Sequence, residues 1–301
     1  MRGGCAAYCS RWLSRIQTVR EHLVFVQVEI NPPLIWVVSP QEPQLNIDTP
    51  LFARYESAVR SYSGDPCSPT LLLAHEGSLS AYYAPIEWRN VQAKVILVGI
   101  TPGKTQANNA LTEARRQLSA GAATQEVLRH AKQTGAFSGT MRPNLVALMD
   151  HIGMPRVLGV RSSADLFGPA SHLLQSASVL PFPVFFNGEN YNGTPDITRT
   201  PLLRELMLAH FLPMVRELPY AVLIPLGPVP TKALAWLVQQ GHVSGRRVLE
   251  GLPHPSGANG ERIAYFLGRK NRNELSAKTD AAKLDAARAL DRPGFRGGLL
   301  A

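Results

Sequence analysis

The feature that most constrains the fold is an apolar run that stops at a glycine-rich turn. Val95 to Val98 contains no polar residue, and Gly99-Ile-Thr-Pro-Gly103 follows directly. A run of this kind predicts a central strand that is covered on both faces. The two glycines let the backbone approach a ligand closely, and Pro102 stiffens the turn between them. We therefore expect a site at the carboxyl end of this strand.

Two interpretations of this turn compete. The ending Gly103-Lys-Thr105 is typical of a phosphate-binding loop, but such a loop has four residues between its glycines, and three separate Gly99 from Gly103. Pro102 also lacks an N–H group that could bind a phosphate. The plainer interpretation is an ordinary connection between a strand and a helix.

The composition indicates a globular protein with a basic surface. The chain has 301 residues, and 45% of them are hydrophobic, which is enough for a sizeable core. Lys and Arg outnumber Asp and Glu by 31 to 22, which favours a polyanionic partner such as nucleic acid. The basic residues are spread along the chain, however, as they are on an ordinary solvated surface.

The cysteines predict neither a metal site nor a disulfide framework. Cys5, Cys9 and Cys67 are few and poorly spaced for zinc or an iron–sulfur cluster. We expect no metal, no cofactor and a reducing bacterial-type cytoplasm. No apolar run reaches the roughly eighteen residues of a membrane span. The Arg-rich start resembles a transit peptide, but a poorly ordered extension is the preferred interpretation.

Strands that alternate with helices predict an α/β domain. Val184 to Asn187, Tyr220 to Leu226 and Arg247 to Leu252 read as further strands after the first. Helical composition covers 49–62, 106–118, 124–131, 143–152, 202–218, 231–239 and much of 262–290. This order predicts four parallel strands with helices on both faces. We expect residues 1–45 to be an extension, 46–272 the α/β domain and 273–301 a C-terminal helix and tail.

Several residues are candidates for ligand binding. Asn187 ends an apolar strand, where an amide is costly unless something satisfies it. Asn190 and Asn192 follow in the same loop, and turn chemistry explains them equally well. Phe137 lies between glycines, where an aromatic ring either faces the core or stacks on a ligand.

Four segments together resemble the uracil-DNA glycosylase superfamily. They are Gly99-Ile-Thr-Pro-Gly103, Gly135-Ala-Phe-Ser138, Val184-Phe-Phe-Asn187 and His254-Pro-Ser-Gly257. The resemblance covers about residues 50 to 270, and the first motif is most similar to the mismatch-specific uracil/thymine branch. It implies a three-layer α/β/α fold with a central four-stranded parallel sheet. It also implies a monofunctional enzyme that flips a nucleotide out of DNA and hydrolyses its N-glycosidic bond without a metal or cofactor.

The resemblance assigns a role to each matching residue. His254 would donate a hydrogen bond to the departing base, and Thr101 stands where the family positions the attacking water. The base would lie among Phe137, Asn187, Gly103 and Ile100, with Phe137 stacking on it and Asn187 reading its pairing edge. Ser256, Gly257 and Lys104 would hold the DNA backbone.

The sequence departs from the family pattern in three places. Thr101 replaces the family's Asp or Asn and cannot act as a base near pH 7, so Asp196 or Glu189 would have to substitute or leaving-group stabilisation would carry the rate. Gly103 replaces a bulky Tyr of the strictly uracil-specific branch and predicts a roomier pocket. Ala258 replaces a Leu wedge and predicts weaker base extrusion.

Three functions follow as hypotheses. The first is a monomeric DNA glycosylase that removes uracil or a mismatched or 5-modified pyrimidine, including bulky phage-type bases, in repair or in defence against foreign DNA. The second is a catalytically silent module of the same fold that binds modified DNA. The third is a nucleotide-handling α/β enzyme, which would need magnesium.

Overall fold

The computed structural model describes residues 25–28, 35–38, 51–135 and 141–288. The chain divides into two compact units, 1–49 and 50–301. In the first unit, β1 (Phe25–Val28) pairs with β2 (Ile35–Val38) in an antiparallel ladder. The predicted site residue Phe137 lies outside the described residues.

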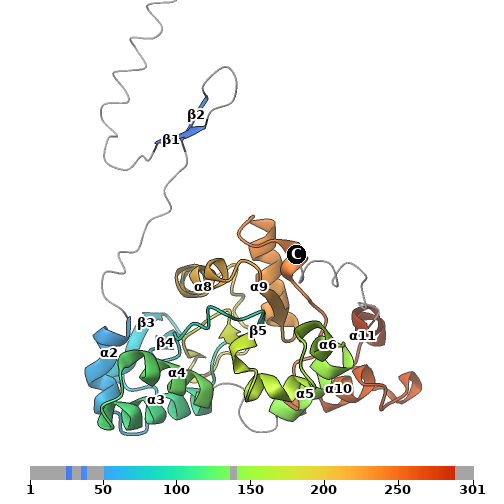
Figure 1. The fold of residues 1–301 in the computed structure, drawn as a ribbon, viewed down its shortest axis with the longest axis horizontal. Coiled ribbons are helices and arrows are strands. Elements are labelled where there is room, and N and C mark those ends of the chain that lie inside the picture. The colour runs from blue at the N-terminus through green and yellow to red at the C-terminus, as the bar shows by residue number, and fades with distance from the viewer. Residues whose placement is uncertain (1–24, 29–34, 39–50, 136–140, 289–301) are drawn as a thin grey trace, which may run out of the picture. The chain divides into compact units, whose positions relative to one another are not determined.

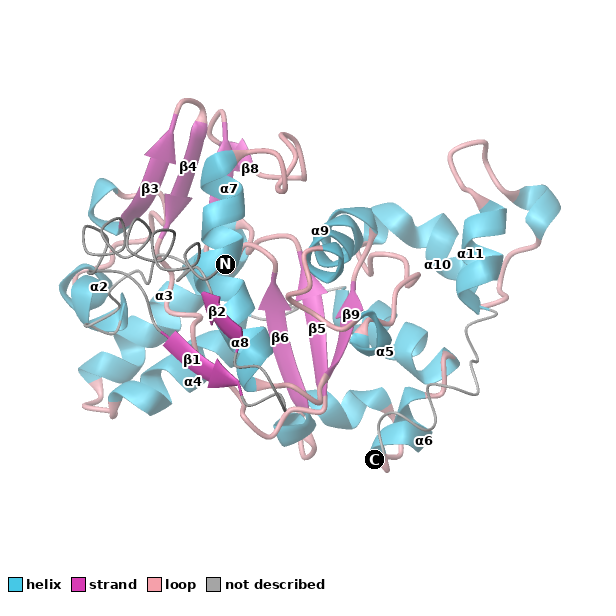
Figure 2. Cartoon of the chain, turned by 90° about the horizontal axis from the view of Figure 1, so that it is seen from above, coloured by secondary structure: helices cyan, strands magenta, loops and turns pink. Residues whose placement is uncertain are grey.

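The second unit contains two sheets (Figure 1). A three-stranded parallel sheet has the order β6-β5-β9, with β6 (Leu174–Ser178), β5 (Val95–Gly99) and β9 (Val222–Pro225). A four-stranded antiparallel sheet has the order β3-β4-β7-β8, with β3 (Leu72–Glu76), β4 (Leu79–Tyr82), β7 (Val184–Phe186) and β8 (Glu189–Asn190). Figure 2 shows the three parallel strands side by side. The fold is therefore mixed α/β.

Strand β5 is central and covered on both faces, as its uninterrupted apolar run predicts. Ile96 and Val98 belong to a core cluster that includes residues of α8 (Leu212–Glu217) and α9 (Pro228–Gln239). Val95 and Leu97 belong to a second cluster, with residues of α5 (Met141–His151) and α10 (Gly260–Phe266). All four side chains are fully buried, which stabilises the fold by roughly 1.5–3 kcal/mol for each large aliphatic side chain.

The predicted helices are confirmed, with small shifts at their ends. They are α2 (Leu51–Arg60), α3 (Lys104–Ser119), α4 (Thr124–Gly135), α5, α7 (Pro201–Leu206), α8 and α9; α6 (Met154–Leu158) was not predicted. A π-helical turn, Met207–Phe211, joins α7 to α8, and the helical stretch near the C-terminus is split into α10 and α11 (Ala281–Arg288). Within the described residues, no helix has both the length and the apolar character needed to cross a membrane.

The prediction of a four-stranded parallel sheet is wrong. Strand β6, which the sequence did not predict, pairs with β5 from Val95↔Leu174 to Gly99↔Ser178. The segment Val184–Phe186 lies instead in the antiparallel sheet, between β4 and β8. The segment expected as the fourth strand makes a single bridge, Leu223↔Val248.

Strand β6 escaped prediction because its sequence, Leu-Gln-Ser-Ala-Ser, is mostly polar. Gln175 is nevertheless 2% exposed. Its side-chain oxygen accepts a hydrogen bond from the Asn90 N–H at 2.7 Å, and its amide nitrogen donates to the carbonyl oxygens of Trp88 at 3.3 Å and Ser176 at 2.9 Å. A buried amide with these partners avoids the desolvation cost that normally excludes it from a central sheet.

Candidate active site

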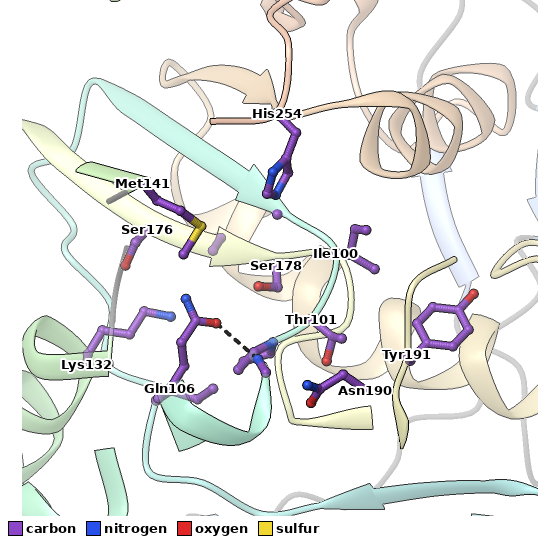
Figure 3. Close-up of a pocket in the computed structure, with 16 residues that line it drawn as sticks. Ile100, Thr101, Gln106, Lys132, Met141, Ser176, Ser178, Asn190, Tyr191 and His254 are labelled. Atoms are coloured by element: carbon purple, nitrogen blue, oxygen red, sulfur yellow. Dashed lines mark hydrogen bonds between the residues drawn. The ribbon is translucent and has the colours of Figure 1, made fainter. Parts of the chain in front are cut away.

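A cavity of about 260 Å³ opens at the carboxyl ends of β5 and β6, where the apolar run predicts a site. Several parts of the fold line it: the turn after β5, the start of α3, the end of α4, the start of α5, strands β6 and β8, and the segments around Ile86 and His254 (Figure 3). Its polar lining residues are Thr101, Gln106, Lys132, Ser176, Ser178, Asn190, Tyr191 and His254. Gly103 and Ile100, two of the residues predicted to bind the base, also line it.

The Thr101 hydroxyl is occupied by the backbone that follows β6. It donates to the Phe182 carbonyl oxygen at 2.8 Å and accepts from the Val184 N–H at 3.1 Å. A hydroxyl has one proton and two acceptor lone pairs, so a single lone pair remains. Thr101 therefore ties the turn after β5 to the start of β7, and it can position a water only by accepting a hydrogen bond from it.

The first backbone amides of α3 are also occupied. The Gly103 N–H donates to Gln106 Oε1 at 3.0 Å, and the Lys104 N–H donates to Asn190 Oδ1 at 2.9 Å. A phosphate-binding loop would offer such amides to its ligand. The structure therefore disfavours the phosphate-loop interpretation for a second reason besides spacing.

His254 enters the cavity as a neutral donor. The Ser256 N–H donates to His254 Nδ1 at 3.2 Å, so the proton of the neutral ring lies on Nε2. Burial lowers the pKa of His254 below its usual value, which favours this neutral form at pH 7. Gly227 has φ +88°, and a Cβ added there would lie 3.2 Å from the Cβ of His254, so the histidine packs directly against a bare backbone.

Asn187 does not reach the cavity. It is exposed, has φ 52°, and with Gly188 at φ 79° forms the turn between β7 and β8. Two successive left-handed residues are typical of the Asn-Gly hairpin turn. The expected burial of this amide is therefore wrong. Asn190, for which turn chemistry was an equal explanation, lines the cavity instead.

The residues predicted to hold the DNA backbone do not line the cavity. Ser256 precedes a short 3-10 turn, and its Oγ accepts from Asn259 Nδ2 at 3.0 Å. Gly257 and Ala258 are exposed beside it, and Lys104 is exposed in the first turn of α3. Gly257 and Lys104 therefore remain accessible to the backbone of a bound DNA outside the cavity.

Lys132 and Glu87 are half-buried side chains whose charges act on each other, and sequence reasoning missed both. Burial lowers the pKa of Lys132 to about 8, against the opposing effect of the Glu87 charge. Burial also raises the pKa of Glu87 to about 7, although the Tyr83 hydroxyl donates to its Oε1 at 2.8 Å. Glu87 Oε2 has no hydrogen-bond partner among the described residues. Nothing in the pattern of α4 distinguishes Lys132 from an ordinary surface lysine.

Gly135 holds the end of α4 close to α3. A Cβ added there would lie 3.1 Å from the Gln106 carbonyl oxygen and 3.3 Å from the Ala110 Cβ. The close approach places Lys132, one turn earlier on α4, near the Gln106 side of the cavity (Figure 3). Gln106 lies three residues after the N-cap Gly103, the spacing of a capping box, but Gly103 lacks the side chain that makes this signature recognisable in a sequence.

The two carboxylates proposed as substitutes for the missing acid lie elsewhere. Asp196 forms an ion pair with Lys232 and accepts from the Thr198 hydroxyl at 2.7 Å. Glu189 is exposed on β8. No Asp or Glu is found among the described residues that line the cavity, and these described residues contain no cluster of three or more metal-binding side chains.

Comparison with known proteins gives a clear relative. Over 218 residues the chain is 36% identical to "Uncharacterized protein YoxB" of Bacillus subtilis (strain 168), and the match covers 71% of this chain and 85% of that protein. The chain belongs to the YoxB family. No family model matches it, and no solved structure matches it.

In this YoxB-family chain, the described residues of the cavity can stabilise negative charge, and no carboxylate among them is placed to abstract a proton from water. His254 offers a neutral N–H, and Lys132 offers an ammonium that is mostly protonated at pH 7. Donors of this kind act most strongly where charge develops in a low-dielectric site.

Proposed function

We propose that this protein is a DNA glycosylase, with a fold related to the uracil-DNA glycosylase superfamily, that flips a pyrimidine into the cavity and hydrolyses its N-glycosidic bond. The observation that carries the proposal is the oriented, neutral His254 at a cavity on the carboxyl edge of β5. The bond breaks to give an oxocarbenium-like sugar and an anionic base. A site that lowers the energy of the departing anion can therefore carry much of the rate.

The mechanism that we propose follows from the lack of Asp and Glu among the described residues that line the cavity. Thr101 retains one acceptor lone pair and no free proton, so it can orient a water but not deprotonate it. The base would leave first, stabilised by the His254 Nε2–H, and water would then add to the sugar cation. The proton released by that water would go to solvent or to the departed base.

The charge of the chain supports DNA as the partner. The formal net charge is +9, and contacts to phosphates release counterions on binding. DNA affinity should therefore fall by orders of magnitude between roughly 50 and 200 mM salt. A fluorescence-polarisation titration that shows no salt dependence would exclude nucleic acid as the partner.

The second candidate is a silent module that binds modified DNA. The occupied Thr101 hydroxyl and the absence of Asp and Glu from the described cavity lining favour it. The two candidates make the same prediction for binding and different predictions for cleavage.

A panel of oligonucleotides followed by alkaline treatment distinguishes them. The strands carry uracil, thymine mismatched with guanine, hypoxanthine, ethenocytosine or a bulky 5-substituted pyrimidine. Cleavage of any of them by the full-length protein, lost in His254→Ala, supports the glycosylase. Base-selective binding with no cleavage in single-turnover assays supports the silent module.

A further inference from the structure

The two amide side chains in the cavity have their orientations fixed by the backbone. Backbone N–H groups can only donate, so the side-chain atoms that face the Gly103 and Lys104 N–H groups must be the oxygens of Gln106 and Asn190. The amide nitrogens of both side chains are then left with two N–H donors each. Gln106 and Asn190 therefore keep their N–H groups available to the cavity, whereas one lone pair of each oxygen is occupied by the backbone.

Lys132 adds a third donor to the cavity. Its ammonium has no acceptor in hydrogen-bond contact among the described residues, and Figure 3 shows its side chain directed into the cavity from α4, on the Gln106 side. An ammonium can donate three hydrogen bonds and accept none. Glu87 acts on this ammonium through its charge, and the N–H groups that face the cavity are available to an acceptor on a bound ligand.

His254 completes the donor set from the opposite side of the cavity (Figure 3). Its Nδ1 is occupied by the Ser256 N–H, which leaves Nε2–H as a donor. Ser176 and Ser178 can donate or accept. No carboxylate of the described residues lines the cavity as a counterpart.

We propose that Lys132 and Gln106 form a specificity-determining pair that binds an exocyclic carbonyl oxygen of the flipped base and rejects an exocyclic amino group. This inference rests on the proposed function and specifies its substrate class. Bases with a keto group at that edge, uracil and its 5-substituted derivatives, present an acceptor to two donors. Cytosine and its 5-substituted derivatives present an amino group, which would leave donors facing donors.

Binding to DNA that cannot be cleaved tests this pair separately from catalysis. The probes are identical duplexes with one 2′-fluoro-arabino-uridine or one 2′-fluoro-arabino-cytidine, titrated against the full-length protein by fluorescence polarisation. We expect the uridine duplex to bind at least about tenfold more tightly. In Gln106→Glu, one carboxylate oxygen can still cap Gly103, and the other places an acceptor in the cavity beside Lys132, so the preference should vanish or reverse.

Two further variants complete the test. Lys132→Met should lower the preference for uridine by about tenfold, and it should still fold, because Glu87, with a pKa raised to about 7, can take up a proton once its partner charge is removed. Lys283→Met removes the same charge from an exposed position on α11 and should leave the preference unchanged. Thermal unfolding of each variant verifies that it is folded.

The outcomes separate this inference from the proposed function. Equal binding of both duplexes, or tighter binding of cytidine, overturns the inference even if uracil is cleaved. A uridine preference that depends on Lys132 and Gln106, in a protein that cleaves nothing, supports the inference and overturns the glycosylase. If neither duplex binds, both proposals fail.

Discussion

The turn after β5 and the end of α4 both line the cavity, but the polar groups of the turn are hydrogen-bonded within the protein, whereas the ammonium at the end of α4 faces the cavity. In the turn, the Thr101 hydroxyl and the Gly103 and Lys104 N–H groups all have partners within the protein. At the end of α4, the Lys132 ammonium is directed into the cavity, and Glu87 acts on it through its charge. The glycine-rich turn is therefore mainly structural, whereas the end of α4 carries a hydrogen-bond donor that is available to a ligand.

This contrast shows that a motif and a binding group need not coincide. A turn of fixed shape needs its own hydrogen bonds satisfied, which removes those groups from chemistry. A group available to a ligand is one that the fold leaves unsatisfied at an energetic cost.

The strongest test compares His254 with Thr101 during the reaction. If leaving-group stabilisation carries the rate, His254→Ala should lower single-turnover cleavage by about 10²–10³, or about 2.7–4 kcal/mol. Thr101→Ser, which keeps the hydroxyl, should retain most of the activity. A Thr101→Ser protein that is folded but inactive, with His254→Ala active, would show that water positioning dominates.

Stability gives the second test of the contrast. Thr101→Val removes a hydroxyl that satisfies the Phe182 carbonyl and the Val184 N–H, so urea denaturation should show a loss of about 2–4 kcal/mol. Thr101→Ser should recover most of this loss. Equal stability of the Val variant and the parent would mean that water replaces the hydroxyl, and that the turn is less tightly bound than its geometry indicates.

The pH dependence of the free energy of unfolding tests the environment of Glu87 and Lys132. Glu87 has a pKa of about 7 in the folded chain against an ordinary 4.5, so its contribution to stability falls as pH rises from about 4.5 to about 7. Lys132 has a pKa of about 8 against an ordinary 10.5, so its contribution rises between about 8 and 10.5. Relative to the double variant Glu87→Gln/Lys132→Met, the parent should be least stable near pH 7–8, by about 1–3 kcal/mol.

Urea denaturation at pH 5, 7.5 and 10 measures this difference in the free energy of unfolding. The double variant serves as the reference at each pH, so that other titrating groups cancel. A parent-minus-variant difference that is constant across the three pH values would mean that both side chains are well solvated.

The smallest effect is expected in the β7–β8 turn, outside the cavity. Asn187→Ala places a Cβ-bearing residue without a favourable side chain at φ 52° and should cost about 0.5–1 kcal/mol in thermal unfolding. Asn187→Gly should cost little or nothing. Neither change should alter the ranking of substrates, and an altered ranking would return Asn187 to the base-binding site.

The sequence predicted the elements better than their pairing. The apolar run of β5 and the amphipathic helices were readable because burial on both faces, or on one, leaves a direct pattern. The partner of β5 was not, since the polar composition of β6 is compatible with a sheet only through the contacts of Gln175 with Asn90 and Trp88. Contacts between residues so distant in sequence leave no local pattern.

The residues of the candidate site, like the pairing of the strands, could be predicted only in part from the sequence. The positions of Ile100, Gly103 and His254 at the cavity follow from strand ends and motifs. Asn187 was misplaced because an apolar segment followed by Asn reads equally well as a parallel strand or as a hairpin arm. Lys132 has no local signal, because its burial depends on how α4 packs against α3.

Gly135 has no side chain, and the size of the residue at this position therefore affects the dimensions of the cavity. Because a side chain at that position would press on the α3 backbone at Gln106 and on Ala110, its size controls the separation of the two helices that carry Gln106 and Lys132. Gly135 also lines the cavity, so Gly135→Ala and larger replacements would fill part of it while they press the two helices apart, and the residue at this position therefore limits which sizes of base can enter.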